Sequence, residues 1–284
     1  MSKDLKSFGT DGRAGGAAAL LRKDAAFLSC ALFVAAVAVL CFCAPFIAPY
    51  GYDVQNLPEA VSPPSAEHWM GTDALGRDIL SRMLYGGRIS FSVGILATFV
   101  SIAIGVCYGM LSGMAGGRID AAMMRAVDVA YSFPFTIFVI LLMVAFGRSV
   151  WLIFVAIGAV EWLTMARIVR GMTLDLKSRQ FVEASRALGQ STAKIMLRHI
   201  LPNLTGTVLV CAALTVPSVM LLEAFLSFLG LGVQAPLPSW GTMLKEGAEC
   251  MEDAPWMLVF PAVLFSAILY CLNKMGEKLS ETFG

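Results

Sequence analysis

The residues of this chain that could do chemistry are few, and two of them are acids inside apolar segments. Glu161 and Glu223 each interrupt a long apolar run. A carboxylate inside a membrane can relay protons, bind a cation or meet a charged group of a substrate. The two histidines, His68 and His199, lie far apart along the chain, and the sequence has no phosphate-binding loop, H-E-x-x-H or G-x-S-x-G motif. We therefore do not expect an enzyme, and energy for transport would come from an ion gradient or from ATP hydrolysed on another chain.

A polar segment between two apolar runs is the other functional candidate. Residues 183–203 read EASRALGQSTAKIMLRHILPN. Residues from Gln180 to Leu188 favour a helix, and small side chains on it would let the surface of another protein approach the backbone closely. These small residues are Ala184, Ser185 and Ala187.

The second half of this segment predicts a bend and a second helix. Gly189 suits the left-handed residue that follows a helix end. Ser191 suits the N-cap of a helix that we expect to stop before Pro202, where the apolar run resumes. A short helix, a sharp bend and a rigid lead into a membrane span can transmit displacement from a docked partner, because a packed helix shifts as a unit.

The composition determines what must position these residues. Hydrophobic residues make up 58% of the 284 residues and charged residues 14%, which exceeds the apolar content that a soluble domain buries. A membrane span needs about 20 apolar residues. We predict an all-α polytopic membrane protein with six transmembrane helices, at residues 25–46, 89–111, 129–146, 150–166, 204–229 and 256–272.

The orientation follows from the basic residues, which stay on the cytoplasmic side in short loops. With both termini inside, most of the 21 Lys and Arg residues lie in cytoplasmic segments. The chain then divides into a cytoplasmic tail at 1–24, a first anchor at 25–46, an extracytoplasmic loop at 47–88, a membrane core at 89–273 containing the cytoplasmic loop 167–203, and a cytoplasmic tail at 274–284.

The positions of the acids along the predicted spans suggest different roles. Glu161 lies eleven residues into its span, roughly 16 Å deep, and either faces an aqueous pathway, where it could meet the amino group of a peptide, or is paired or protonated within the bundle. Glu223 falls near the outer boundary, where a structural role is favoured. Asp120, Arg125 and Asp128 have the spacing of ion pairs within one helix.

The seven cysteines do not predict a metal site. Six of them fall within predicted spans, and only Cys250 lies in an outer loop. Buried cysteines of this kind usually act as small apolar residues. We therefore predict no metal bound by this chain.

The loop at 183–203 resembles the EAA signature of ABC-importer permeases. That signature reads E-A-A, three residues, Gly, nine residues, Ile, one residue, Leu-Pro. The matching positions are Glu183, Ala184, Gly189, Leu201 and Pro202. Ser185 replaces the second Ala and His199 replaces the Ile.

Further blocks are similar to the family of dipeptide, oligopeptide and nickel permeases. They are Gly71-Thr72-Asp73 with Gly76-Arg77-Asp78, Ser81-Arg82, residues 86–90 (GGRIS), 132–134 (SFP), 165–171 (MARIVRG) and 227–232 (SFLGLG). The likeness runs from His68 to Asn273, and the loop sequences are most similar to an oligopeptide permease subunit that pairs with a second, different permease.

The resemblance implies a type I ABC-importer permease in the bacterial inner membrane. Its expected partners are a second permease, two cytoplasmic ATPases, an extracytoplasmic binding protein and the peptide cargo, without nucleic acid. ATP and Mg²⁺ would bind to the ATPases, and no cofactor would bind to this chain. The expected coupling residues are Glu183, Ala184, Ser185, Ala187, Leu188, Gly189 and Pro202, and Glu161 is a pathway candidate.

Other functions compete with this interpretation. Within the family, the cargo could be a dipeptide, nickel or a metal chelate. Outside it, a secondary transporter could use Glu161 and Glu223 as proton or cation sites, but no inverted repeat is visible. That class, like a channel or passive scaffold, would leave the EAA resemblance unexplained.

Overall fold

The computed structural model describes residues 24–146 and 150–283, and most of this range is helical. Within it there is no strand, and an isolated antiparallel bridge joins Thr72 and Asp78. Four helices are long and apolar enough to cross a membrane: Ala25–Phe42 (α2), Ile79–Ala115 (α4), Thr192–Phe228 and Pro255–Phe283 (α12). The predicted all-α membrane fold is confirmed over the described residues, but the count of six spans is not.

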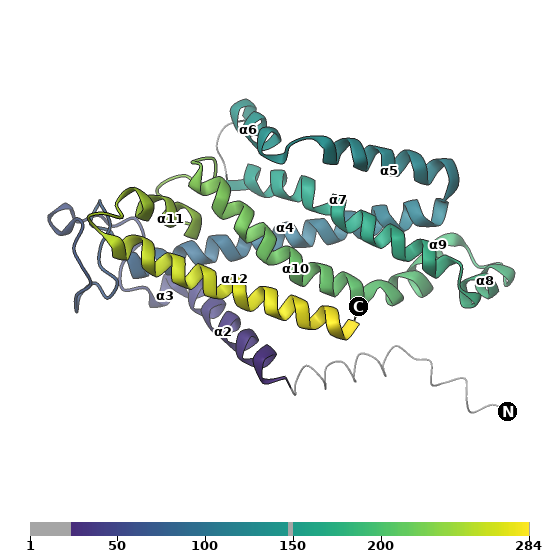
Figure 1. The fold of residues 1–284 in the computed structure, drawn as a ribbon, viewed down its shortest axis with the longest axis horizontal. Helices are drawn as coiled ribbons and strands as arrows, with labels where there is room; N and C mark the ends of the chain where they lie inside the picture. The colour runs from purple at the N-terminus through teal and green to yellow at the C-terminus, as the bar shows by residue number, and fades with distance from the viewer. Residues whose placement is uncertain (1–23, 147–149, 284) are drawn as a thin grey trace.

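The long helices lie side by side along the long axis of the molecule (Figure 1). They are α4, α7 (Val150–Lys177), α10 (Leu201–Phe228) and α12. The 48–78 loop and α11 (Trp240–Glu249) lie at one end, whereas α8 (Gln180–Ala187) and α9 (Thr192–Ile195) lie at the other (Figure 1). The loop predicted to be extracytoplasmic and the candidate coupling loop are therefore at opposite ends of the bundle.

The packing of α4 against α7 depends on three glycines spaced four residues apart. A Cβ on Gly105 would lie 2.6 Å from Met165 Cβ, and one on Gly109 would lie 2.5 Å from the Ala166 carbonyl oxygen. A Cβ on Gly113 would lie 2.7 Å from Thr173 Cβ. Small residues at this spacing let two membrane helices approach to backbone contact.

Two predicted spans are interrupted at prolines. The segment 129–146 is split between α5 (Gly117–Ser132) and α6 (Phe135–Phe146), which are bent by 82° when measured to residues 137–146. Phe133 is extended, with ψ 129°, because the Pro134 ring disfavours helical geometry in the preceding residue. The segment 25–46 likewise breaks at Cys43, after which Pro45 lies in the first turn of α3 (Ala44–Ile47).

Other helices extend beyond the predicted spans. α4 begins at Ile79 instead of residue 89, because Asp78 caps it by accepting a hydrogen bond from Ser81 N at 2.7 Å. α7 continues to Lys177. α12 continues to Phe283, so the described part of the predicted tail 274–284 is helical, and Lys278 pairs with Asp24 at 3.2 Å. The rest of the N-terminal tail, residues 1–23, lies outside the described residues.

The 48–78 loop is held to α4 and α11 by a buried cluster of charges. Asp73 accepts hydrogen bonds from Leu75 N at 2.8 Å and Arg77 Nε at 2.7 Å, and it also pairs with Arg82. Glu246 of α11 pairs with both arginines and receives a bond from Arg82 Nη2 at 3.1 Å. Asp73 and Arg77 of the 71–78 block therefore act together in this cluster, whereas Asp78 caps α4.

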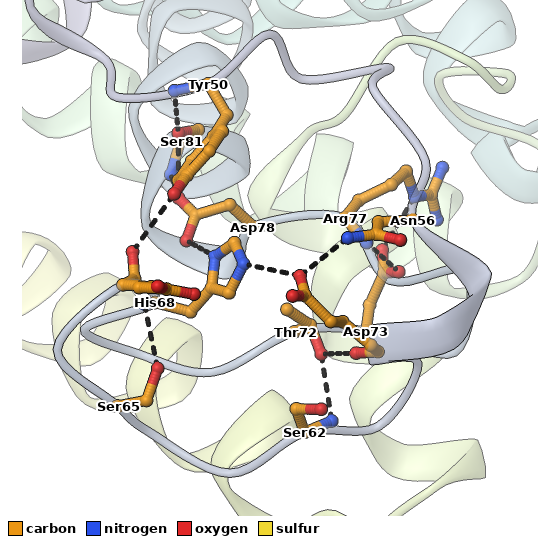
Figure 2. A network of polar contacts seen from close by, with 12 residues as sticks. Tyr50, Asn56, Ser62, Ser65, His68, Thr72, Asp73, Arg77, Asp78 and Ser81 are labelled. Atoms are coloured by element: carbon orange, nitrogen blue, oxygen red, sulfur yellow. Dashed lines mark hydrogen bonds and ion pairs between the residues drawn. The ribbon is translucent and has the colours of Figure 1, made fainter.

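His68 provides a second attachment of the same loop (Figure 2). Its Nδ1 lies 2.9 Å from Asp78 Oδ1 and its Nε2 lies 3.2 Å from Glu59 Oε2, at the end of the 3₁₀ turn Leu57–Glu59 (η2). Burial lowers the pKa of His68, but the hydrogen bonds to Asp78 and Glu59 outweigh this effect and raise it above its ordinary value. Only the protonated ring can donate to both carboxylates at once.

We expect the loop to be held more tightly at acidic pH. Because the pKa of His68 is raised in the folded protein, its stabilising contribution is complete below about pH 6.5, the ordinary histidine value, and is lost as the pH rises through the raised pKa. Hydrogen exchange of residues 56–81, corrected for intrinsic rates, should become faster across that interval. In His68→Gln this pH dependence should disappear, and if it persisted another group would be responsible.

Candidate functional site

The candidate coupling segment forms the bend that its sequence predicts. Gly189 has φ +74°, in the left-handed region. Gly189 N donates to Arg186 O at 2.9 Å and Gln190 N donates to Ser185 O at 3.1 Å, which is the hydrogen-bond pattern of a Schellman turn. Ser191 Oγ then accepts from Lys194 N at 3.4 Å and caps α9. The left-handed glycine and the serine cap are both confirmed.

The coupling residues expected from the sequence do not share one face. Most of them are exposed at the end of the bundle, and Leu188 keeps 80% of its surface accessible. The exposed members are Glu183, Ala184, Ala187, Leu188 and Gly189. Ser185 is only 6% exposed and lies on the inner side of α8, as does Val182, which packs in a core with Ile195 and Ile200. Contact between Ser185 and a docked protein is therefore not supported.

Pro202 does not end the second helix, contrary to the prediction. Helical structure continues from Thr192 to Phe228 through a π-helical segment, Met196–Ile200 (η3), in which Leu201 N donates to Met196 O. A proline ring inside a helix clashes with the carbonyl four residues earlier and leaves it without a donor. The wider π turn directly before Pro202 accommodates both effects. Pro202 is half-buried at the start of α10 and is not part of the exposed face of α8.

The two intramembrane acids have different surroundings. Glu161 is half-buried on α7 and has no hydrogen bond or ion pair with any residue that the structure describes. Glu223 is fully buried and accepts hydrogen bonds from Ser90 Oγ at 3.1 Å and Ser227 Oγ at 2.7 Å. Glu223 therefore connects α10 to α4, which agrees with a structural role, although it is enclosed and not at a lipid interface.

The ion pairs predicted within one helix form between helices instead. Asp120 of α5 accepts from Arg170 Nε at 2.8 Å and Nη2 at 2.6 Å. Asp128 pairs with Arg167 at 2.9 Å. These two ion pairs join α5 to α7. Over residues 24–146 and 150–283, no group of three or more His, Cys, Asp or Glu could hold a metal ion.

One polar cluster was missed by the sequence reasoning. Ser90, Ser227 and Ser239 surround Glu223, and Trp240 N donates to Ser90 Oγ at 3.3 Å. The signal was present, since the GGRIS and SFLGLG blocks each contribute a serine, but their spacing of more than 130 residues gives no indication that they meet.

The family follows from comparison with known proteins. Residues 105–279 match the family described as "binding-protein-dependent transport system inner membrane component". The chain belongs to this family. It is therefore a membrane-integral component of a transport system and not an enzyme.

Relatives match along most of the chain. It is 46% identical over 261 residues to the oligopeptide transport system permease protein OppC of Haemophilus influenzae, covering 91% of this chain and 84% of that protein. It is 44% identical over 251 residues to the dipeptide transport system permease protein DppC of Bacillus subtilis, covering 88% and 78%. The predicted membership of the peptide permease group is confirmed.

A solved structure shows the same fold. A chain of the MetNI methionine ABC transporter, in an inward-facing conformation, superposes with a TM-score of 0.57 at 18% identity, covering 71% of this chain and 97% of that chain. At this identity the match concerns the fold alone, and it confirms the predicted ABC-permease architecture.

Alanine substitutions at two glycines should have opposite effects. A Cβ added to Gly189 or to Gly171 would meet open space, but only Gly189 has a positive φ. Gly189→Ala should destabilise the turn by about 1–2 kcal/mol, whereas Gly171→Ala, within α7, should be neutral or stabilise by up to about 1 kcal/mol. Hydrogen-exchange protection of residues 182–195 measures the first effect, and equal protection in both variants would contradict the left-handed turn.

Proposed function

We propose that this chain is the permease subunit of an ATP-driven oligopeptide importer and that α8 couples it to an ATPase. The observation that carries this proposal is the exposed face of α8, where small residues and Glu183 surround a sharp turn at one end of the bundle. The relatives named as oligopeptide permeases support the cargo class.

The proposed assembly contains a second, different permease, two ATPases and an extracytoplasmic binding protein. ATP and Mg²⁺ bind to the ATPases and not to this chain. Both termini and the 167–203 loop face the cytoplasm of a bacterial cell, as the distribution of Lys and Arg favours. ATP binding draws the ATPases together, displaces α8 and moves the bundle between inward-open and outward-open states.

The free energy needed to switch the transporter between its two states determines how strongly a weakened α8 contact would affect transport. A ligand must favour one state by about 5.5 kcal/mol to move a two-state equilibrium from 1:99 to 99:1. Loss of a few kcal/mol at the α8 contact would therefore uncouple ATP hydrolysis from transport while leaving the fold intact.

A dipeptide is a second candidate cargo, because the DppC relative is similar over nearly as much of the chain.

Reversing the charge of Glu183 tests the coupling. In the complex purified with its partner permease, ATPases and binding protein, Glu183→Arg should reduce peptide-stimulated ATP hydrolysis about tenfold, equivalent to about 1.4 kcal/mol. Glu281→Arg makes the same charge change at an exposed site on the last turn of α12 and should have little effect. Equal stimulation in all three proteins would overturn the role of α8.

The cargo class is tested in the same assay. Stimulation by peptides of three to five residues supports oligopeptide transport, whereas stimulation by dipeptides alone or by nickel would reassign the cargo. A complex without any associated ATPase would overturn the mechanism.

We also propose that Glu161 meets the amino group of the peptide in the pathway. It is the one acid on α7 within the predicted span, and no described residue pairs with it. Glu161→Gln should raise the KM for peptides with a free amino terminus by about tenfold, as expected for a charge-assisted hydrogen bond of about 1.5 kcal/mol. N-acetylated peptides provide the matched control, and an equal change for both kinds of peptide would exclude this contact.

A further inference from the structure

The two positions at which the loop departs from the EAA pattern contact one another. Ser185 Oγ lies 3.3 Å from His199 Nε2, although fourteen residues separate them. The rings of His199 and Phe181 also lie near each other, tilted by 49° with centroids 6.3 Å apart. Ser185 replaces an Ala of the pattern and His199 replaces an Ile, so two apolar positions have become one polar pair.

The direction of this hydrogen bond follows from the number of protons. Ser185 Oγ donates its only hydrogen to Phe181 O, at 2.8 Å. It can then only accept from His199, so Nε2 must carry a proton. The neutral ring protonated at Nε2 and the imidazolium both satisfy this requirement. The bond therefore persists whether or not His199 is charged.

Each partner is held rigidly by its own element. The Ser185 carbonyl accepts the Gln190 N–H that closes the Schellman turn of α8. His199 lies in η3, and its carbonyl accepts from Asn203 Nδ2 at 2.7 Å at the start of α10. The π turn before Pro202 sets the direction in which the His199 side chain leaves the helix. The bond thus joins the turn of α8 to η3, and the His199 carbonyl is bonded in turn to Asn203 in the first turn of α10.

The apolar contacts of α8 with the bundle involve several helices at once. Val182 packs among residues of α4, α7, α9, η3 and α10 in one apolar core, and such packing has no directional preference. The Ser185–His199 bond is directional and reaches η3, which continues directly into α10. A displacement of α8 along this bond would be passed to α10.

We propose that Ser185 and His199 are positioning residues that make α8 move together with α10, so that ATPase motion reaches this helix. This inference rests on the proposed coupling function. Neither residue contacts the ATPase in this proposal. They transmit a displacement that the exposed face of α8 receives.

A cycle of variants in the complete transporter tests the pair. Ser185→Ala and His199→Ile each remove one partner and leave the other without its bond, and the double variant restores the apolar pair of the EAA pattern. We expect each single variant to lower the peptide taken up per ATP hydrolysed by about two- to tenfold, the range for one hydrogen bond. The double variant should recover most of the loss. His199→Gln, which keeps an N–H donor, should be affected least.

A further readout follows the attachment of α8 itself. Hydrogen exchange of residues 182–188 should accelerate in both single variants and recover in the double variant.

The outcomes distinguish this inference from the proposed function. Coupled transport by the wild type with unaffected single variants, or with losses that simply add in the double variant, would overturn the pair alone. A wild-type complex without peptide-stimulated hydrolysis would overturn the proposed function and, with it, the role of the pair in coupling.

Discussion

The close approach of α4 and α7 is the contact on which the rest of the structure depends. It is possible because Gly105, Gly109 and Gly113 present no side chain where α7 crosses, and in a membrane helices are held together by this kind of close packing because lipid is as apolar as a leucine side chain. α4 begins in the charge cluster at one end of the bundle, and α7 leads into α8 at the other. The glycine contact therefore fixes the two ends relative to each other.

Buried charges give this apolar bundle its specific arrangement. Removing a charge from water is costly unless a partner is present, and nearly every deeply placed charge has one. Asp120 pairs with Arg170 and Asp73 pairs with two arginines, whereas the Glu223 carboxyl group accepts hydrogen bonds from serines of two helices. Each pair is satisfied in one arrangement of the helices. Glu161 is the exception within the predicted span of α7, because none of the described residues pairs with it. For this reason we propose a functional role for it.

The coupling segment combines an exposed face with a rigid attachment. α8 presents Ala184 and Ala187 outward, while Val182 and Ser185 fix its inner side. The Schellman turn at 185–190 and the π turn at 196–201 lie close together along the chain, so the path from α8 to α10 contains few bonds that rotate freely. In the proposed coupling, a segment of this kind would transmit motion because it deforms less than the contacts on either side of it.

The sequence alone determined the features that depend on local backbone chemistry: helices throughout, the left-handed turn at Gly189 and the cap at Ser191. It could not show which residues meet across the bundle, because that depends on the rotation and separation of helices distant in the chain. The spacing of Asp120, Arg125 and Asp128 suggested pairs within one helix, yet the two aspartates pair with Arg170 and Arg167 of α7. The inward direction of Ser185, its contact with His199 and the π turn at Pro202 were likewise decided by tertiary packing, which sets the partners available to each side chain.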